Sequence, residues 1–279
     1  MIAPGCTIAG CAVAGSSRYQ EGLTQMLLAV DIGNTQTVIG LIHGRAIESR
    51  WRMATDATLT SDEIRVKISG LLALDGHEHD AIDGVAIASV VPSLTAAYED
   101  LAERITGTRP LVIGPGVKTG LAIAYENPRE VGADRIVNAV AAIEAHGAPV
   151  IVVDFGTATT LDVVDASGAY LGGAIAPGVE TSAEALFRRA ARLSAVDLEP
   201  PTRVIGRSTR ESIQAGLLFG EAARVDGLVR RTWLELGYEC PVVATGGLAE
   251  RISPLCETIT AVDIDLTLTG LALVWERRQ

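Results

Sequence analysis

The sequence predicts an α/β protein made of two similar halves, each with a central mixed sheet flanked by helices, and with a cleft between the halves. Twice, an apolar run ends in Asp-x-Gly with a threonine six residues after the aspartate: Asp31, Gly33 and Thr37, then Asp154, Gly156 and Thr160. In each copy a turn glycine, Gly44 or Gly168, follows the aspartate by 13 or 14 residues. Matching segments of this kind indicate an internal duplication of a three-stranded meander.

The first half opens with three strand patterns, at residues 27–32, 37–43 and 47–53. Thr60 and Glu63 have the spacing of a capping box, which predicts a helix that continues through Leu74. A strand is expected at 84–89. Proline at the start of the next helical pattern predicts a helix over residues 92–106.

The second half repeats the scheme with strand patterns at residues 149–155, 159–165 and 170–176. The apolar spacing that begins at Ile213 predicts a long helix ending near Gly237. A strand at 241–247 then takes the place that 84–89 holds in the first half. A last strand near Ile259 and a helix over 267–275 complete the prediction.

Helical periodicity beside Asp134 predicts a further helix between the two halves. We therefore divide the chain into a lobe of residues 26–145 and a lobe of residues 146–279.

Residues 1–25 are rich in small side chains and are expected to form a disordered extension. The alternative, a lipoprotein signal cleaved before Cys11, lacks a basic segment and a long apolar segment.

The composition indicates a globular protein that does not bind nucleic acid or membranes. Of the 279 residues, 48% are hydrophobic and 20% charged, which allows sizeable cores. Asp and Glu outnumber Lys and Arg by 34 to 23, and the net charge of −11 disfavours anionic partners. The four cysteines show no CxxC spacing, so we expect a reducing, cytoplasmic setting.

The two Asp-x-Gly motifs are the main candidates for binding phosphate. Gly33 permits close approach of the backbone, and Asn34, Thr35 and Thr157 offer neutral donors to phosphate oxygens. Because Asp31 and phosphate are both anionic, this aspartate implies Mg²⁺ or water between them. Asp154 has the alternative role of holding a cation. The structural alternative for both motifs is a tight turn capped by its own side chains.

Two other segments have the character of a binding site. Asp134 lies in the first turn of a predicted helix, where the helix dipole alone would favour it, yet a carboxylate there can also accept a hydroxyl proton during phosphoryl transfer. Arg135 offers a planar fork for a substrate carboxylate. Gly246 and Gly247 lie between a strand and a helix, where adenine or ribose can approach bare backbone. The pair His77 and His79 is better explained by a polar loop than by a metal.

The combination of these segments resembles the type III pantothenate kinase family, within the superfamily of acetate and sugar kinases, Hsc70 and actin. It is carried by DIGNT, ENPREVGADR, DFGTATTLDVV, YLGGAIAPG and ATGG, and it runs from Met26 to the C-terminus. The resemblance implies two duplicated ribonuclease H-like, actin-like domains. It also implies ATP-dependent phosphorylation of pantothenate, a homodimer, Mg²⁺ and a monovalent cation, K⁺ or NH₄⁺.

The resemblance also assigns roles to single residues. Asp134 matches the general base, and the substrate contacts are Tyr125, Gly132, Arg135 and, from the partner subunit, Thr209. Asp154 matches the ligand of the monovalent cation. The ATP and phosphate contacts are Asp31 (with Mg²⁺, directly or through water), Gly33, Asn34, Thr35, Thr157, Gly246 and Gly247. Two positions depart from the family pattern: Ser208 stands where Asn is expected, and Leu161 where Phe is expected.

Two alternatives remain open at this point. A kinase of the same superfamily could act on another small hydroxylated substrate, such as a sugar or acetate. A catalytically silent regulator could use the same scaffold, although the presence of Asp31, Asp134 and Asp154 argues against inactivity.

Overall fold

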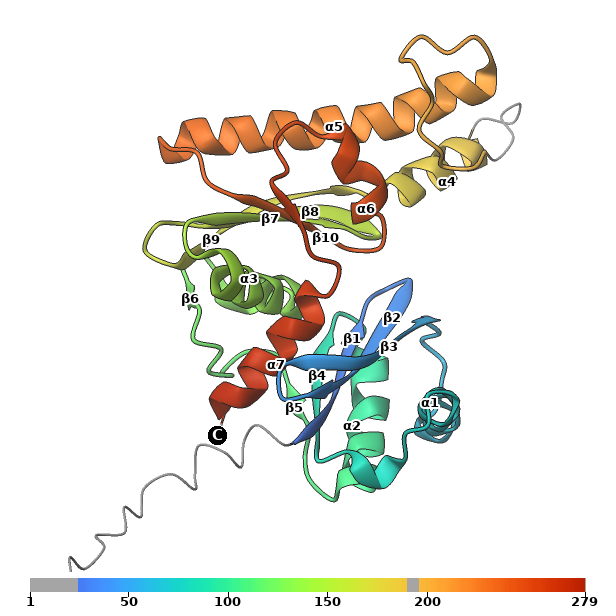
Figure 1. Cartoon of the computed structure of the whole chain (residues 1–279), viewed down its shortest axis with the longest axis vertical. Helices are drawn as coiled ribbons and strands as arrows, with labels where there is room; N and C mark the ends of the chain where they lie inside the picture. The colour runs from blue at the N-terminus through green and yellow to red at the C-terminus, as the bar shows by residue number, and fades with distance from the viewer. Residues whose placement is uncertain (1–24, 190–195, 279) are drawn as a thin grey trace, which may run out of the picture.

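A computed structural model describes residues 25–189 and 196–278 (Figure 1). Apart from Gln25, the predicted extension of residues 1–25 lies outside the described residues. None of the described helices is both long and apolar enough to cross a membrane.

The first sheet has five strands in the order β3-β2-β1-β4-β5. They are β1 (Met26–Ile32), β2 (Gln36–His43), β3 (Ala46–Ala54), β4 (Gly84–Ser89) and β5 (Leu111–Val112). The first three form the predicted antiparallel meander, and β4 lies parallel to β1. Two helices, α1 (Ser61–Leu74) and α2 (Pro92–Thr106), pack on this sheet, and the capping box of Thr60 and Glu63 is confirmed.

The second sheet repeats this topology, so the predicted duplication is confirmed. Its order is β11-β10-β7-β8-β9-β6, in which β9-β8-β7-β10-β11 reproduces the order of the first sheet. The strands are β6 (Ala122–Ile123), β7 (Val150–Phe155), β8 (Ala158–Val164), β9 (Ala169–Pro177), β10 (Val242–Thr245) and β11 (Ala261–Val262). The extra edge strand β6 precedes the second meander in the chain and pairs in parallel with β9.

Helices α3 (Ala133–His146) and α7 (Leu266–Arg278) lie between the two sheets (Figure 1). A single apolar cluster contains residues of β1 and β4, of β7 and β10, and of both helices. Helix α5 (Thr209–Leu236) crosses the outer face of the second sheet, next to α4 (Val179–Arg189) and the short α6 (Ala249–Ile252). The two sheets therefore share one central core, and the cleft opens at its edge.

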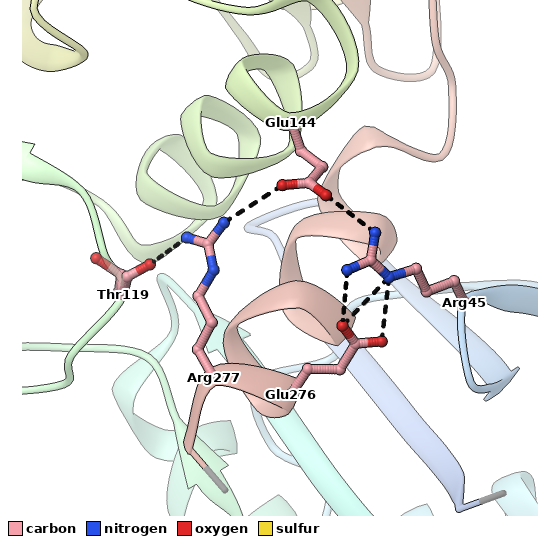
Figure 2. A network of polar contacts seen from close by, with 5 residues as sticks. All are labelled: Arg45, Thr119, Glu144, Glu276 and Arg277. Atoms are coloured by element: carbon pink, nitrogen blue, oxygen red, sulfur yellow. Dashed lines mark hydrogen bonds and ion pairs between the residues drawn. The ribbon is translucent and has the colours of Figure 1, made fainter. Parts of the chain in front are cut away.

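A polar network fastens the β2–β3 hairpin to both central helices (Figure 2). Arg45, in the hairpin turn, contacts Glu144 of α3 at 2.9 Å and Glu276 of α7 at 3.1 Å. Arg277 of α7 donates to the carbonyl of Thr119 at 2.7 Å. Exposed ion pairs contribute little individually. Their shared role is to fix the hairpin relative to the two helices.

Gly270 sets the distance between α3 and α7. A Cβ atom at this position would lie 2.1 Å from the carbonyl oxygen of Val137, and backbone cannot yield as a flexible side chain does. We expect Gly270→Ala to lower the free energy of unfolding by about 1–3 kcal/mol, measured by urea denaturation. Gly70→Ala on α1 is the matched control, because no atom lies within 4 Å of its Cβ, and it should stabilise by up to about 1 kcal/mol. Equal effects at the two sites would contradict the close-packing argument.

Candidate active site

The three aspartates predicted from the sequence line one cavity, of about 440 Å³. Asp31 stands near the end of β1, Asp154 near the end of β7 and Asp134 in the first turn of α3. Topologically equivalent strand ends of the two sheets thus face each other, as the duplicated motif predicts. The same cavity is lined by the other predicted nucleotide residues: Gly33, Asn34, Thr35, Thr157, Gly246 and Gly247.

Burial and repulsion from neighbouring carboxylates disfavour the charged forms of Asp31 and Asp154. Burial raises the pKa of Asp31 well above its ordinary value, and repulsion from Asp134 and Asp154 adds to the effect. Burial, with repulsion from Asp134 and Asp162, raises the pKa of Asp154 to about 7. A cation placed among these groups would relieve both the burial penalty and the repulsion.

Asp154 is held by a relay that the sequence did not reveal. The side-chain amide nitrogen of Asn138 donates to Asp154 at 3.2 Å, and the hydroxyl of Thr267 donates to the side-chain oxygen Oδ1 of Asn138 at 2.7 Å. Asn138 lies one turn after Asp134 on α3 and is 1% exposed. A polar residue among the apolar positions of this helix was the available signal. The relay connects the carboxylate of the second sheet to both central helices.

The two phosphate motifs meet across the cleft. The hydroxyls of Thr35 and Thr157 lie 2.8 Å apart and form a hydrogen bond. Gly246 has a φ of 93°, and a Cβ there would lie 2.3 Å from a carboxylate oxygen of Asp154. Only glycine is compatible with this backbone and this approach. The cavity is therefore bordered by hydroxyl groups and bare backbone, both suited to phosphate oxygens.

The position of the Asp134 carboxylate explains why residue 132 is a glycine. A Cβ at Gly132 would lie 2.4 Å from a carboxylate oxygen of Asp134, so any side chain would displace that group. The same oxygen accepts the backbone N–H of Arg135 at 2.9 Å. Asp134 is thus fixed at the helix N-terminus with its carboxylate in the cavity.

Arg135 is engaged inside the protein. Its Nε and one Nη lie 2.7 Å from the same oxygen of Asp162, a carboxylate that is fully buried on β8. Tyr170 donates to that oxygen as well, and its ring lies 5.7 Å from the guanidinium carbon. The sequence analysis missed Asp162, although an acid inside the apolar run of β8 was the signal. The binding of a substrate carboxylate by Arg135 stays a prediction.

Tyr125 extends this cluster toward the surface. Its ring lies 6.4 Å from that of Tyr170 and packs against Gly172, where a Cβ would be 2.8 Å from the Tyr125 ring. Tyr125 is 36% exposed. A continuous row of contacts therefore runs from Asp134 through the Arg135–Asp162 pair to an exposed aromatic ring.

Thr209 is not brought together with Asp134 in the single chain. It begins α5 and lines a separate cavity of about 900 Å³, between α4 and α5.

Ser208, the first departure from the family pattern, caps α5 by accepting the N–H of Glu211 at 3.2 Å, which is also a role of Asn. Leu161, the second departure, lies on β8 and is buried in the apolar core between the second sheet and α5.

The sequence profile described as type III pantothenate kinase matches residues 27–231. A protein of Thermomicrobium roseum named type III pantothenate kinase is 52% identical over 252 residues, which cover 90% of this chain and 97% of the relative. The protein of that name from Moorella thermoacetica is 50% identical, covering 90% of this chain and 99% of the relative. The chain belongs to the type III pantothenate kinase family.

Solved structures share the fold of this chain. A structure titled as a putative Baf family transcriptional activator from Campylobacter jejuni aligns with a TM-score of 0.59 and 16% identity, over 90% of this chain and 98% of that one. Component A of (R)-2-hydroxyglutaryl-CoA dehydratase from Acidaminococcus fermentans aligns with a TM-score of 0.55 and 16% identity, over 91% and 97%. At this identity the likeness shows the fold alone. The predicted pair of ribonuclease H-like, actin-like domains is confirmed.

The cavity has the donor chemistry of a site for hard cations. Carboxylates, hydroxyls and amide oxygens are the ligands that Mg²⁺ prefers. Among the described residues, no group of three or more His, Cys, Asp or Glu side chains could by itself hold a metal ion.

The raised pKa of Asp154 predicts a pH-dependent stability difference between the wild type and Asp154→Asn. The folded protein holds this proton up to about pH 7, whereas the unfolded chain loses it near pH 4. Between these values the folded state binds more protons, so ionisation of Asp154 lowers stability as pH rises. In buffer without Mg²⁺ or K⁺, the Tm of Asp154→Asn minus that of the wild type should increase from pH 5 to pH 8.

The control is Asp165→Asn, because hydrogen bonds from Ser167 and Ala169 lower the pKa of Asp165. Its ionised form stabilises the fold and is already fully present above the unfolded pKa of about 4, so the Tm difference between this variant and the wild type should stay constant from pH 5 to pH 8. A pH-independent Tm difference for Asp154→Asn would contradict the prediction.

Proposed function

We propose that this protein transfers the γ-phosphate of ATP to pantothenate and forms 4′-phosphopantothenate, the first step of coenzyme A biosynthesis. The observation that carries the proposal is the convergence of Asp31, Asp134 and Asp154 on one cavity in a chain of this family. Relatives at about 50% identity over nine-tenths of the chain bear the name of this activity.

The nucleotide is assigned to the cleft between the two sheets. Thr35 and Thr157, whose hydroxyls meet across the cleft, bind the terminal phosphates together with Gly33 and Asn34. The backbone at Gly246 and Gly247 receives the adenosine end. Asp31 binds Mg²⁺, directly or through water, and Asp154 binds the monovalent cation. When bound, these cations neutralise phosphate charge and the repulsion among the carboxylates.

Asp134 acts as the general base. Its carboxylate is held by the Arg135 N–H and faces the cavity, so it can accept the proton of the pantothenate hydroxyl as that oxygen attacks the γ-phosphate in line. The leaving group is ADP. Gly132 keeps the base in this position, because a larger residue would displace it.

Pantothenate is assigned to the surface between Asp134 and Tyr125. Arg135 supplies positive charge for its carboxylate, with the guanidinium orientation fixed by Asp162. The exposed edge of Tyr125 covers the apolar part of the vitamin. Thr209 completes this site from the partner subunit of a homodimer, which accounts for its distance from Asp134 in one chain.

The direct test is an assay with pantothenate, Mg²⁺-ATP and K⁺, coupled to ADP release and checked for phosphopantothenate by mass spectrometry. Product formation is expected. Turnover with sugars or acetate but not with pantothenate would indicate another kinase of the superfamily. No turnover with any acceptor would indicate a regulatory protein on this scaffold.

Mixed dimers test the shared site. Asp134→Asn and Thr209→Ala are expected to be impaired alone, but each mixed dimer contains one site with neither change. Random pairing should therefore restore activity to about a quarter of the wild-type value, because half of the dimers are mixed and each has one intact site. Recovery should disappear if the two variants are mixed without subunit exchange. No recovery after exchange would place Thr209 in the site of its own chain.

A cytoplasmic location follows from this proposal, because ATP is a substrate. Cys240 and Cys256, the two cysteines within the described residues, are free thiols, which is compatible with a reducing compartment.

A further inference from the structure

Two arginines on β3 line the nucleotide cavity and have no role in the site described above. Trp51 and Met53 pack against the apolar core of the first lobe, so the alternation of the strand places Arg50 and Arg52 on its other, exposed face. Both arginines line the main cavity. They also line an adjoining space of about 300 Å³, which shares Val38, Arg50, Arg52, Gly246, Gly247 and Ile264 with it.

The two arginines differ in their partners. Arg50 forms an ion pair of 2.6 Å with Asp265 in the segment before α7. Within residues 25–189 and 196–278, no hydrogen bond or ion pair involves the side chain of Arg52. Its Nη1 would lie 3.3 Å from a Cβ at Gly247, so the guanidinium of the first lobe reaches across to the glycine pair of the second.

The negative charge of the cavity lining gives the unpaired guanidinium of Arg52 a role in binding an anionic ligand. Among the residues that the structure describes, four carboxylates line the cavity, those of Asp31, Asp134, Asp154 and Glu180. Of the three arginines in the same part of the chain that line it, Arg50 is paired with Asp265 and Arg251 donates to the carbonyl of Leu198 at 3.1 Å. A nucleoside triphosphate is strongly anionic and is repelled by the carboxylates. Arg52 is the lining cation that no described residue occupies.

We propose that Arg52 binds the end of the polyphosphate nearest the ribose from the first lobe, where Gly246 and Gly247 of the second lobe receive the adenosine. A guanidinium makes short, charge-assisted hydrogen bonds to phosphate oxygens, and the pair can be bidentate. The nucleotide then connects the two lobes by its own charge. Arg52 is a binding residue that sets affinity for the phosphate chain, whereas the proton transfer remains with Asp134.

The test compares nucleotide binding by calorimetry in the wild type, Arg52→Gln and Arg52→Glu. For Arg52→Gln the Kd of Mg²⁺-ATP and the KM for ATP should rise about 10- to 100-fold, because a hydrogen bond to a charged group is lost. Binding of adenosine, which has no phosphate, should be unchanged. Arg52→Glu should bind ATP more weakly still. The kcat at saturating ATP and the KM for pantothenate should stay close to wild type.

Arg65→Gln is the matched control, because it removes the same charge from an exposed position on α1 outside the cavity, and it should change none of these values. Thermal unfolding checks that each variant is folded. Unchanged ATP affinity in Arg52→Gln, an equal loss for adenosine, or no further loss in Arg52→Glu would each overturn the inference.

The inference rests on the proposed function only in the choice of ATP as the ligand. The binding measurement needs no turnover, so it stands even if pantothenate is not the acceptor. Failure of the wild type to bind Mg²⁺-ATP would refute the proposed function, whereas equal binding by wild type and Arg52→Gln would refute the role of Arg52 alone.

Discussion

Asp134→Asn is expected to lower kcat by about 10²- to 10⁴-fold, the usual contribution of a general base. Asparagine has the same shape, and its side-chain oxygen can still accept the N–H of Arg135 that fixes the present carboxylate. The variant therefore keeps the helix start and the cavity wall but cannot take the hydroxyl proton. Affinity for Mg²⁺-ATP, measured by calorimetry, should stay within a few-fold of wild type.

Glu130→Gln is the control for this substitution. Glu130 lies four residues earlier, in the short 3₁₀ helix Pro128–Glu130, and is not among the residues that line the cavity. It loses the same charge and should keep its turnover. A kcat for Asp134→Asn within tenfold of wild type would remove Asp134 from the role of base.

Asp31→Asn is expected to affect activity and stability in opposite directions. Its carboxylate has a raised pKa because it is buried near Asp134 and Asp154, so the neutral amide relieves both the burial penalty and the repulsion. The Tm measured without Mg²⁺ should therefore rise. Without the charge that holds Mg²⁺ near the phosphates, kcat/KM for ATP should fall by about 100-fold or more.

Asp80→Asn, an exposed change outside the cavity, should leave both quantities unchanged. Added Mg²⁺ should stabilise the wild type more than Asp31→Asn, because a ligand stabilises the state that binds it. A lower Tm together with full activity in Asp31→Asn would contradict both parts of the prediction.

The helices and strands that the sequence predicted are those marked by signals in nearby residues. The Asp-x-Gly strand ends, the Thr60–Glu63 capping box and the proline at the start of α2 each act within a few residues. The strands β5 and β6, of two residues each, depend on pairing with β4 and β9 and left no pattern of their own. Helix α4 was missed as well: no element was predicted between the second meander and α5.

The residues of the candidate site likewise divide into those that a local motif predicts and those that depend on distant partners. Asp31 and Asp154 were found because the duplicated motif marks equivalent strand ends. Partnerships between distant residues were not visible: Thr267 bonds Asn138 from 129 positions away, and Asp162 pairs with Arg135 from 27 positions away. Arg52 looked like an ordinary exposed residue of an edge strand, and only the approach of the second sheet makes it part of the cavity.

Helix α7 is the last of the described elements, and it completes the wall of the pocket. A ribosome makes the chain from its N-terminus, so this helix is made after every other described element. It nevertheless supplies Thr267 to the cavity wall and fills the space beside Val137. A nascent chain that stops before Leu266 would carry Asp31, Asp134 and Asp154 without the packing that orients them. A late nonsense codon should thus abolish function while sparing every residue assigned to the chemistry.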